Sequence, residues 1–391
     1  MDAKWKSPNT IIGSVAKGKF FFKRDNIIRD IWKEIEKGNY VLIAAPRRVG
    51  KSSVMQNMEE NPKDGYKLIF RNIQSVDSEK NFYKIMYELI LNCLNTSQKI
   101  GSWFSTYKSK IGITGISTTG INIENKEIKY KNEIDEVINK LKDEGETVVL
   151  LIDELPEVLF RLYKNGKQEE AISILKNLRQ WRQNADSQKL RFVLAGSIGI
   201  HYVVKLIEGR TSDLNDLKLI DCNPLLATEI DTYFDWTTGE ATVQYNSELR
   251  KYLTSKIQYF VPYFFNIMLE EIDKIAFNCQ IPEITIETID KAFENVIKNN
   301  DHFKDWKNRL KDYLPIEDFK FINEILKHIS HNDKITIQQV YDKSIEYGKE
   351  DDFMEFMSDL QHDGYIIQIE TEFRFISPFL KEFWKRNNPI L

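Results

Sequence analysis

The length, composition and charge of the chain limit the classes of protein to which it can belong. Its 391 residues exceed what one compact core usually holds, so two or three domains are expected. The 55 basic and 59 acidic side chains give a net charge of −4, which argues against a protein that coats nucleic acid by bulk attraction but leaves room for a local basic face. No apolar run approaches the roughly 20 residues of a membrane span, and the N-terminus lacks the apolar segment of a signal peptide, which predicts a cytoplasmic protein with no membrane partner.

A helix and a strand are expected near the N-terminus. Apolar residues recur at helical spacing over residues 27–35, and Gly38 follows as a helix-ending residue. The apolar run at 40–44 is then predicted to be a strand. The residues just ahead of the helix, which include Arg24, lie where the chain could pass the adenine of a nucleotide bound after that strand.

The segment after this strand has the pattern of a Walker A phosphate loop. A helix is expected at 52–60, so the segment joins a strand to a helix, which is the context that the motif requires. Its backbone N–H groups, with the positive end of the helix, would hold the β- and γ-phosphates. Lys51 would add a charge on the phosphates and the Ser52 hydroxyl would bind Mg²⁺, while Ala45 replaces the glycine of the strict pattern. The loop residues are Ala45, Pro46, Arg47, Arg48, Val49, Gly50, Lys51, Ser52 and Ser53.

The next stretch alternates strand and helix signals. Residues 66–70 are predicted to form a second strand, and an apolar stripe over residues 82–93 predicts a helix. Residues 111–123 are rich in glycine and isoleucine and indicate a β-hairpin inserted at the flank of the sheet. A surface loop without strands is the alternative for this segment.

A Walker B segment provides a second, independent indication of a nucleotide site. Residues 148–152 form an apolar, largely β-branched run without alternation, as expected of a strand buried on both faces of a parallel sheet. Asp153 and Glu154 follow at the tip of that strand. Asp153 would hold Mg²⁺, and Glu154 would polarise the attacking water. The alternative is that the two carboxylates only cap the next helix in solvent.

Two further elements complete the expected core. A helix at 167–185 carries Arg179 and Arg182 on one face, and Arg182 is a candidate for a catalytic arginine that reaches the γ-phosphate of a neighbouring subunit. Pairing of these arginines with surface carboxylates is the alternative. A strand at 191–195 ends near Ser197, a candidate sensor of the γ-phosphate that could equally be a turn residue.

The periodicity changes after Ser197. Residues 226–314 are mostly helical, and Pro262 is a suitable first-turn residue for one of the helices. The charged stretch at 301–313 is predicted to link two domains as a hinge. Residues 316–387 give a helix, a short strand, two helices and a hairpin, which is the element order of a winged helix.

The elements together predict an α/β protein. Strands that alternate with helices indicate a phosphate-loop NTPase core with a parallel, doubly wound sheet. We place this core at 1–222, with the hairpin insertion at about 111–123. A helical lid at 223–314 and a C-terminal winged helix at 315–391 follow.

The chain resembles the archaeal-type ATPases of the STAND branch of AAA-like phosphate-loop NTPases, over nearly its whole length. The resemblance implies an ATP- and Mg²⁺-dependent switch, in which the lid and the winged helix change position with the bound nucleotide and hydrolysis is slow. It also assigns Arg24 and Pro262 to the nucleotide-binding set. The matching segments are 45–53, 151–156, 178–182, 194–199, 215–217, 261–264 and 375–380.

Three functions stay open on the sequence alone. The first is an ATPase that binds ATP between core and lid and uses Glu154 as the general base. The second is a DNA-binding regulator whose winged helix is oriented by ATP, although the acidic run at 350–355 disfavours contact with phosphates. The third is an ATP-binding scaffold without turnover. A protein partner or a second copy of the chain is expected, but the sequence identifies neither the partner nor the pathway.

Overall fold

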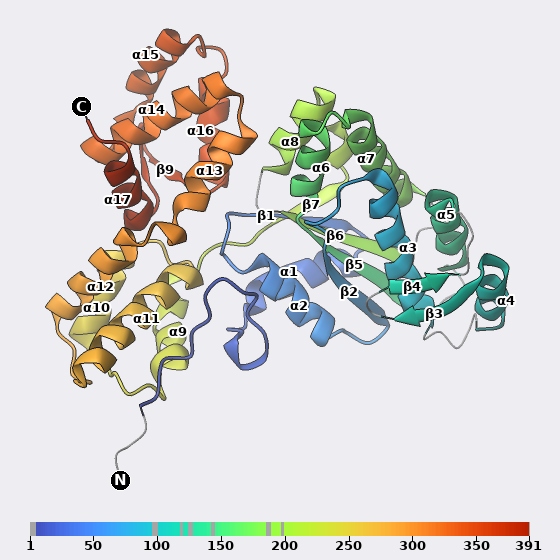
Figure 1. Ribbon diagram of the computed structural model, residues 1–391, viewed down its shortest axis with the longest axis horizontal. Coiled ribbons are helices and arrows are strands. Elements are labelled where there is room, and N and C mark those ends of the chain that lie inside the picture. The colour runs from blue at the N-terminus through green and yellow to red at the C-terminus, as the bar shows by residue number, and fades with distance from the viewer. Residues whose placement is uncertain are drawn as a thin grey trace. The chain divides into compact units, whose positions relative to one another are not determined.

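The computed structural model describes residues 5–95, 101–117, 120–123, 128–141, 145–184, 189–196 and 199–390. Its contacts divide the chain into two compact units, whose elements are labelled in Figure 1. The core unit comprises Lys23–Ala44 and Lys51–Cys222. The C-terminal unit comprises Met1–Phe22, Ala45–Gly50 and Asn223–Leu391. The N-terminal residues, which the sequence placed with the core, therefore pack with the C-terminal half, and so does the first part of the phosphate loop.

The core unit is built on a five-stranded sheet in which all the strands are parallel. Every residue of the Walker B strand from Val148 to Asp153 is buried, which explains why its apolar residues do not alternate with polar ones. The strand order is β2-β5-β6-β1-β7, so β6 separates the Walker A strand from the Walker B strand. The strands are β1 (Tyr40–Ala44), β2 (Tyr66–Asn72), β5 (Thr147–Asp153), β6 (Leu190–Gly196) and β7 (Leu217–Asp221).

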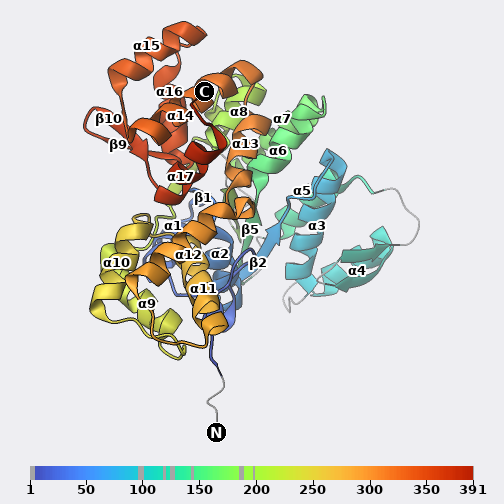
Figure 2. The same cartoon turned by 60° about the vertical axis from the view of Figure 1, so that its left-hand side comes forward.

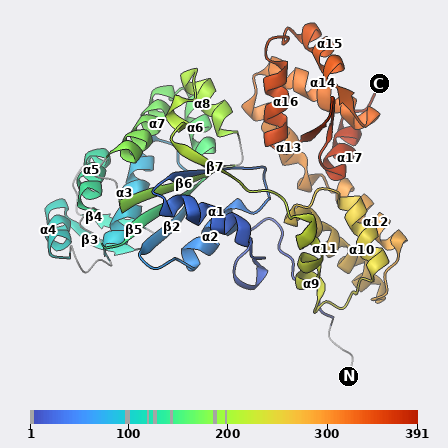
Figure 3. The same cartoon turned by 180° about the vertical axis from the view of Figure 1, so that it is seen from behind.

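Helices cover both faces of this sheet. α1 and α2 lie on one face, and α6, α7 and α8 lie on the other (Figures 1 and 3). α1 buries Ile27, Ile31, Trp32 and Ile35 on the side that meets β1 and β7. The helices of the unit are α1 (Asp25–Glu36), α2 (Lys51–Glu60), α3 (Glu79–Asn95), α4 (Gly101–Ile111), α5 (Tyr130–Leu141), α6 (Leu155–Lys164), α7 (Gln168–Gln183) and α8 (Ile200–Glu208).

A two-stranded antiparallel hairpin occupies the glycine-rich segment of the core unit. β3 (Ile113–Ser117) pairs with β4 (Gly120–Ile123), with an irregular register between Ile113 and Gly115. The structure thus places a hairpin where the sequence offered a hairpin or a loop. It also shows α4 directly before β3, a helix that we did not expect from the sequence.

The C-terminal unit begins with a group of helices around an aromatic and aliphatic core. α11 starts at Pro262, which occupies the first turn as expected. Phe264, Phe265 and Met268 of this helix are fully buried. The helices are α9 (Ile230–Thr238), α10 (Ser247–Ile257), α11 (Pro262–Cys279), α12 (Ile286–Lys298) and α13 (Lys304–Tyr313).

Three helices, a small sheet and a closing helix follow. The sheet is antiparallel with the order β8-β10-β9, and α17 packs against α14 (Figure 2). The Thr336 side chain caps α15 by accepting a hydrogen bond from the Gln339 backbone N–H, which separates β8 from the helix. The elements are α14 (Ile316–Asn332), β8 (Ile335–Thr336), α15 (Ile337–Tyr347), α16 (Phe353–His362), β9 (Ile366–Ile369), β10 (Glu372–Phe375) and α17 (Pro378–Asn387).

The charged stretch at 301–313 does not form an extended linker. Most of it is helix α13, in which Trp306 is only 3% exposed. The Tyr365 hydroxyl donates a hydrogen bond of 2.8 Å to the Trp306 carbonyl oxygen, and the two rings meet edge to face. The expectation of a hinge rested on the lysines of this stretch, but the buried tryptophan anchors it to the elements that follow. Across the described ranges, every helix is too short or too polar to cross a bilayer.

Candidate nucleotide-binding site

Lys51 and Ser52, which the sequence assigned to the nucleotide, lie at the start of α2. Lys51 is the first residue of the helix and is 5% exposed, so its ammonium group is largely removed from bulk water. Gly50 precedes it with a φ of 104°, a backbone conformation that L side chains rarely adopt. The glycine of the motif is therefore required by the backbone at the point where the loop turns into the helix. The N–H groups at the N-terminus of a helix attract anions.

Ser52 and Asp153 meet where α2 begins and β5 ends. The Ser52 hydroxyl donates a hydrogen bond of 2.5 Å to Oδ2 of Asp153. The two residues are 101 positions apart, and they come together because β1 and β5 are parallel strands of the same sheet. The structure thus brings together the two residues that the sequence assigned to the metal.

The environment of Asp153 suits a cation. Burial raises the pKa of Asp153 above its ordinary value, and the neighbouring Glu154 carboxylate adds to this effect. The hydrogen bond from Ser52 and the charge of Lys51 act in the opposite direction. A divalent cation beside this carboxylate would favour its charged form, and Mg²⁺ prefers oxygen ligands of this kind. Mg²⁺ that binds together with a nucleotide takes one or two ligands from the protein and the others from phosphate oxygens and water. Ser52 and Asp153 are therefore enough to provide the protein ligands of such an ion.

Glu154 has an unusual backbone conformation. Its φ and ψ are 64° and 31°, which is left-handed and uncommon for a residue with a side chain. Its backbone N–H donates a hydrogen bond of 3.0 Å to Oδ1 of Asp153. Glu154 is the residue before α6, so the left-handed turn lies between the end of β5 and the start of the helix. Backbone strain of this kind concentrates at functional sites.

The start of α6 lies close against the neighbouring strand. A methyl group added at Gly196, the last residue of β6, would lie 2.4 Å from Cγ and Cδ of Pro156. Only glycine fits there without displacing the proline. The close approach holds α6 against the C-terminal end of β6, the strand that precedes Ser197. Ser197 itself lies outside the described residues, so its role as a sensor stays a prediction.

Arg24, a residue that the sequence assigned to the nucleotide, belongs to the core unit, as Lys51 does. Its side chain belongs to a residue that is 6% exposed, directly before α1. Burial raises the pKa of the Cys222 thiol, whereas the charges of Lys51 and Arg24 both lower it. Both cations are therefore near this one thiol. The sequence assigned Arg24 to the nucleotide, and this location is compatible with that assignment.

The two arginines of the phosphate loop contact residues of the C-terminal unit, to which Ala45–Gly50 belongs. Arg48 donates a hydrogen bond of 2.7 Å to the His302 carbonyl oxygen, and its guanidinium lies 3.9 Å from the centre of the Tyr263 ring. The Tyr263 hydroxyl is 2.9 Å from Nδ1 of His302. Arg47 forms a long ion pair of 4.0 Å with Asp305. Tyr263 follows Pro262 in α11 and lies in the matching segment 261–264, but the sequence assigned it no role, and no motif marks His302.

The remaining loop residues have packing contacts. Val49 is 1% exposed, and Ser53 lies in the first turn of α2. A methyl group at Gly364 would lie 2.7 Å from Cγ of Pro46, so the proline approaches this glycine closely within the C-terminal unit. The Pro46 side chain therefore packs within the C-terminal unit. Contacts with phosphates would come from the backbone of the loop and from α2.

Arg182 does not have the geometry of an arginine that acts on a neighbouring subunit. Its Nε and one terminal nitrogen donate hydrogen bonds of 2.7 and 2.9 Å to the two oxygens of Asp216, and the same terminal nitrogen also donates to the Asp213 carbonyl oxygen. The side chain is 2% exposed. Arg179 is bound to the Asp213 carboxylate at 2.5 Å. Both arginines therefore hold α7 to the segment before β7, which is the pairing that the sequence left as the alternative.

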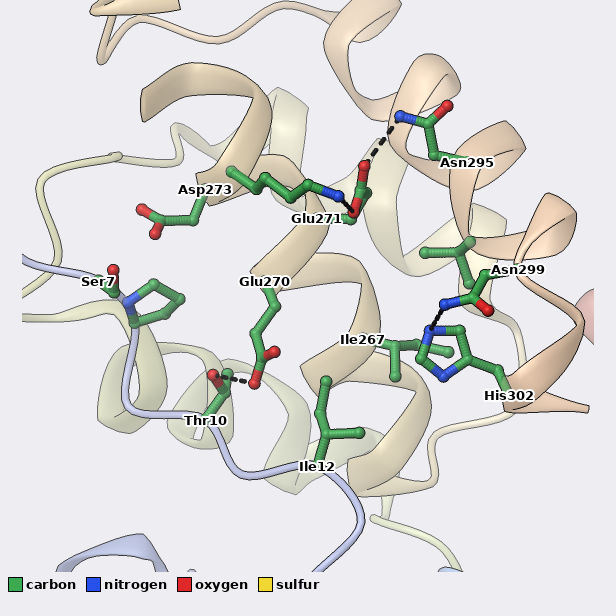
Figure 4. Close-up of a pocket in the computed structure, with 13 residues that line it drawn as sticks. Ser7, Thr10, Ile12, Ile267, Glu270, Glu271, Asp273, Asn295, Asn299 and His302 are labelled. Atoms are coloured by element: carbon green, nitrogen blue, oxygen red, sulfur yellow. Dashed lines mark hydrogen bonds and ion pairs between the residues drawn. The ribbon is translucent and has the colours of Figure 1, made fainter. Parts of the chain in front are cut away.

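A separate cavity of about 550 Å³ lies between the N-terminal segment and helices α11 and α12 (Figure 4). The Thr10 hydroxyl donates to Glu270 at 2.8 Å, and the Asn295 amide donates to Glu271 at 2.8 Å. Asp273 also lines it. Its three carboxylates would repel phosphates, and it contains none of the residues that the sequence assigned to the nucleotide. The contacts instead tie the N-terminal segment and α12 to α11.

Comparison with known proteins agrees with this site. Residues 16–205 match the model of a family described as predicted AAA-ATPase. The structure of the Walker-type ATPase PABY2304 of Pyrococcus abyssi is similar, with a TM-score of 0.59 and 14% identity over 95% of this chain and 98% of that chain. The ORC2 protein of Aeropyrum pernix, in its ADPNP–ADP complexes, has a TM-score of 0.52 and 11% identity over 93% and 92% of the two chains. No curated protein matches the chain. The similar structures confirm the predicted phosphate-loop α/β fold, and the family model matches residues 16–205 as an AAA-ATPase-like segment.

Proposed function

Because residues 16–205 match the family model described as predicted AAA-ATPase, we propose that the chain is a cytoplasmic ATPase that works as a nucleotide-dependent switch. The observation that carries the proposal is the hydrogen bond between Ser52 and Asp153 at the N-terminus of α2, beside Lys51. It unites a phosphate-binding helix end with a carboxylate and a hydroxyl that suit Mg²⁺. The ADPNP–ADP complexes of the similar ORC2 protein support nucleotide binding by this fold.

The residues of the chain have separate tasks in this function. The backbone of the loop and Lys51 bind the phosphates, and Ser52 and Asp153 hold Mg²⁺, which would neutralise charge on the phosphate oxygens. Glu154 accepts a proton from the attacking water and orients it. Hydrolysis transfers the γ-phosphoryl group to that water and leaves ADP and inorganic phosphate. In this proposal Arg182 has a structural task, because its guanidinium is already bound by Asp216.

Replacement of Asp153 tests the metal site. We expect Asp153→Asn to raise the Mg²⁺ concentration needed for half-maximal phosphate release by about 10- to 100-fold, since the amide keeps the shape but removes the charge. The measurement is ATPase activity over a Mg²⁺ titration. Asp64→Asn, an exposed carboxylate of the same unit, is the control. An unchanged Mg²⁺ requirement in Asp153→Asn would contradict the assignment.

The contacts of the phosphate loop support the proposed switch. Arg48 is bound to Tyr263 at the start of α11 and to His302, while the loop continues directly into α2. A nucleotide that reshapes the loop must therefore alter the contacts of Arg48 with α11, and a ligand shifts a conformational equilibrium when it contacts the two states differently. We propose that α14 to β10 form a winged helix that moves with the lid, as the resemblance to the STAND branch implies. A direct DNA-binding function is the alternative and is less well supported, because α16 is acidic.

Hydrogen exchange tests the switch. We expect ADPNP with Mg²⁺ to change the exchange of backbone amides both in residues 45–52 and in the first turns of α11. The Lys51→Ala variant with the same nucleotide is the control for non-specific effects. Changes restricted to the loop and α2 would leave a nucleotide-binding protein without the proposed switch.

A further inference from the structure

Two neighbouring helices of the C-terminal unit expose apolar side chains. Tyr341 is 39% exposed and Ile345 is 55% exposed, and they lie one turn apart on α15 and so share a face of that helix. Met354 of α16 is 42% exposed. The Tyr341 ring meets the ring of Phe353 at 5.5 Å between centroids, which joins the two helices. We call these four residues the α15–α16 surface.

Carboxylates surround this surface. The segment from Tyr341 to Glu355 contains two lysines, and both are neutralised by α14. Lys343 lies 3.3 Å from a carboxylate oxygen of Glu324, and Lys349 pairs with Asp318. The net charge of the exposed segment is therefore strongly negative. Its six acidic residues are Asp342, Glu346, Glu350, Asp351, Asp352 and Glu355.

The cations of the adjoining hairpin are also engaged. Glu372 of β10 accepts a hydrogen bond of 2.6 Å from Lys334 and one of 3.1 Å from Arg374. The Glu372 carboxylate thus binds both Lys334, next to β8, and Arg374 of the hairpin, which are the side chains that could otherwise contact a phosphate there. Recognition of a duplex by such a module needs basic residues on the helix or the wing. The local charge therefore disfavours DNA at this face and suits a ligand of the opposite sign.

We propose that the α15–α16 surface binds a basic amphipathic helix of a protein partner. Its apolar face covers Tyr341, Ile345, Phe353 and Met354, and its flanking lysines or arginines meet the carboxylates around them. Amphipathic helices dock on apolar surfaces through residues spaced three and four apart, and complementary charge fixes their orientation and speeds their association. This surface shares no residue with the nucleotide site, so the proposal goes beyond the ATPase function and does not depend on it.

A synthetic peptide tests the surface on the full-length chain. The probe is a labelled amphipathic helix of about four turns made of leucine and lysine, and its binding is measured by fluorescence anisotropy. The double variant Glu350→Lys/Asp351→Lys should bind it at least about tenfold more weakly, because like charges then face each other. The matched control, Glu248→Lys/Glu283→Lys, makes the same change of net charge on exposed residues elsewhere in the unit and should bind like wild type.

Apolar variants separate specific docking from charge attraction. Ile345→Ser and Met354→Ser should each weaken binding several-fold while leaving thermal unfolding close to wild type, since both side chains are already exposed. A peptide of the same composition with leucine and lysine scrambled should bind weakly. The proposal would be overturned if Glu350→Lys/Asp351→Lys and the control double variant lost the same amount of peptide affinity. It would also be overturned if the serine variants bound the peptide like wild type. So would tighter binding of duplex DNA than of the peptide, or dimerisation of the chain that the serine variants abolish.

Discussion

Lys51→Ala should abolish measurable ATP binding at ordinary concentrations. Lys51 is 5% exposed at the N-terminus of α2, and it is the side-chain cation that the motif places against the phosphates. Hydrogen bonds to charged groups contribute about 2–3 kcal/mol, which corresponds to a loss of affinity of roughly 30- to 150-fold. The loss is expected at the upper end of this range, because a buried ammonium is poorly replaced by water. Isothermal titration with ATP and Mg²⁺ measures it.

The control for this variant must separate binding from folding. Lys63→Ala removes the same charge from an exposed position of the core unit, where the lysine pairs with Glu36. Thermal unfolding without nucleotide shows whether each variant keeps its fold. If folded Lys51→Ala binds ATP as tightly as Lys63→Ala does, the phosphate loop has been assigned to the wrong ligand.

The parts of the site that were predictable from the sequence are those with local signals. The run at 148–152 has no polar positions because its strand is covered on both faces, and Asp153 follows where that strand must end. The step from strand to glycine to Lys51 likewise marks a helix start. Neither prediction depends on which strands are neighbours in the sheet.

Features that depend on long-range contacts were not predictable. The position of β6 between β5 and β1 follows from the packing of helices that are far apart in sequence. Arg182 looked available for a neighbouring subunit, but its partner Asp216 is 34 residues away, and no spacing rule connects them. His302 contacts the loop through its backbone carbonyl oxygen, which any residue could supply. Such contacts leave no pattern in one sequence.

The charged stretch at 301–313 also contains a local signal for packing. The stretch at 301–313 looked like a linker because of its charges, yet Trp306 within it is an aromatic residue that seldom faces water in a lone exposed helix. Its burial against Tyr365 makes α13 part of the packed unit. A single large apolar residue in a charged helix is therefore better evidence for packing than the charges are for a hinge.

Glu154→Gln should leave ATP binding intact and slow hydrolysis by about 100-fold or more, the usual contribution of a positioned general base. Glutamine has nearly the shape of glutamate and the same backbone demands, so the left-handed turn at φ 64° and the hydrogen bond from the residue 154 N–H to Asp153 should survive. What changes is the ability to accept a proton from water. The measurement is phosphate release under saturating ATP, with binding followed separately by titration.

A neighbouring carboxylate provides the matched control for Glu154. Glu157 lies in the first turn of α6, so Glu157→Gln makes the same chemical change three residues further on and should hydrolyse ATP at nearly the wild-type rate. Equal rates in Glu154→Gln and Glu157→Gln would remove Glu154 from the base role. The strained backbone at residue 154 would then be explained by the hydrogen bond from its N–H to the Asp153 carboxylate. That hydrogen bond forms whichever side chain residue 154 carries.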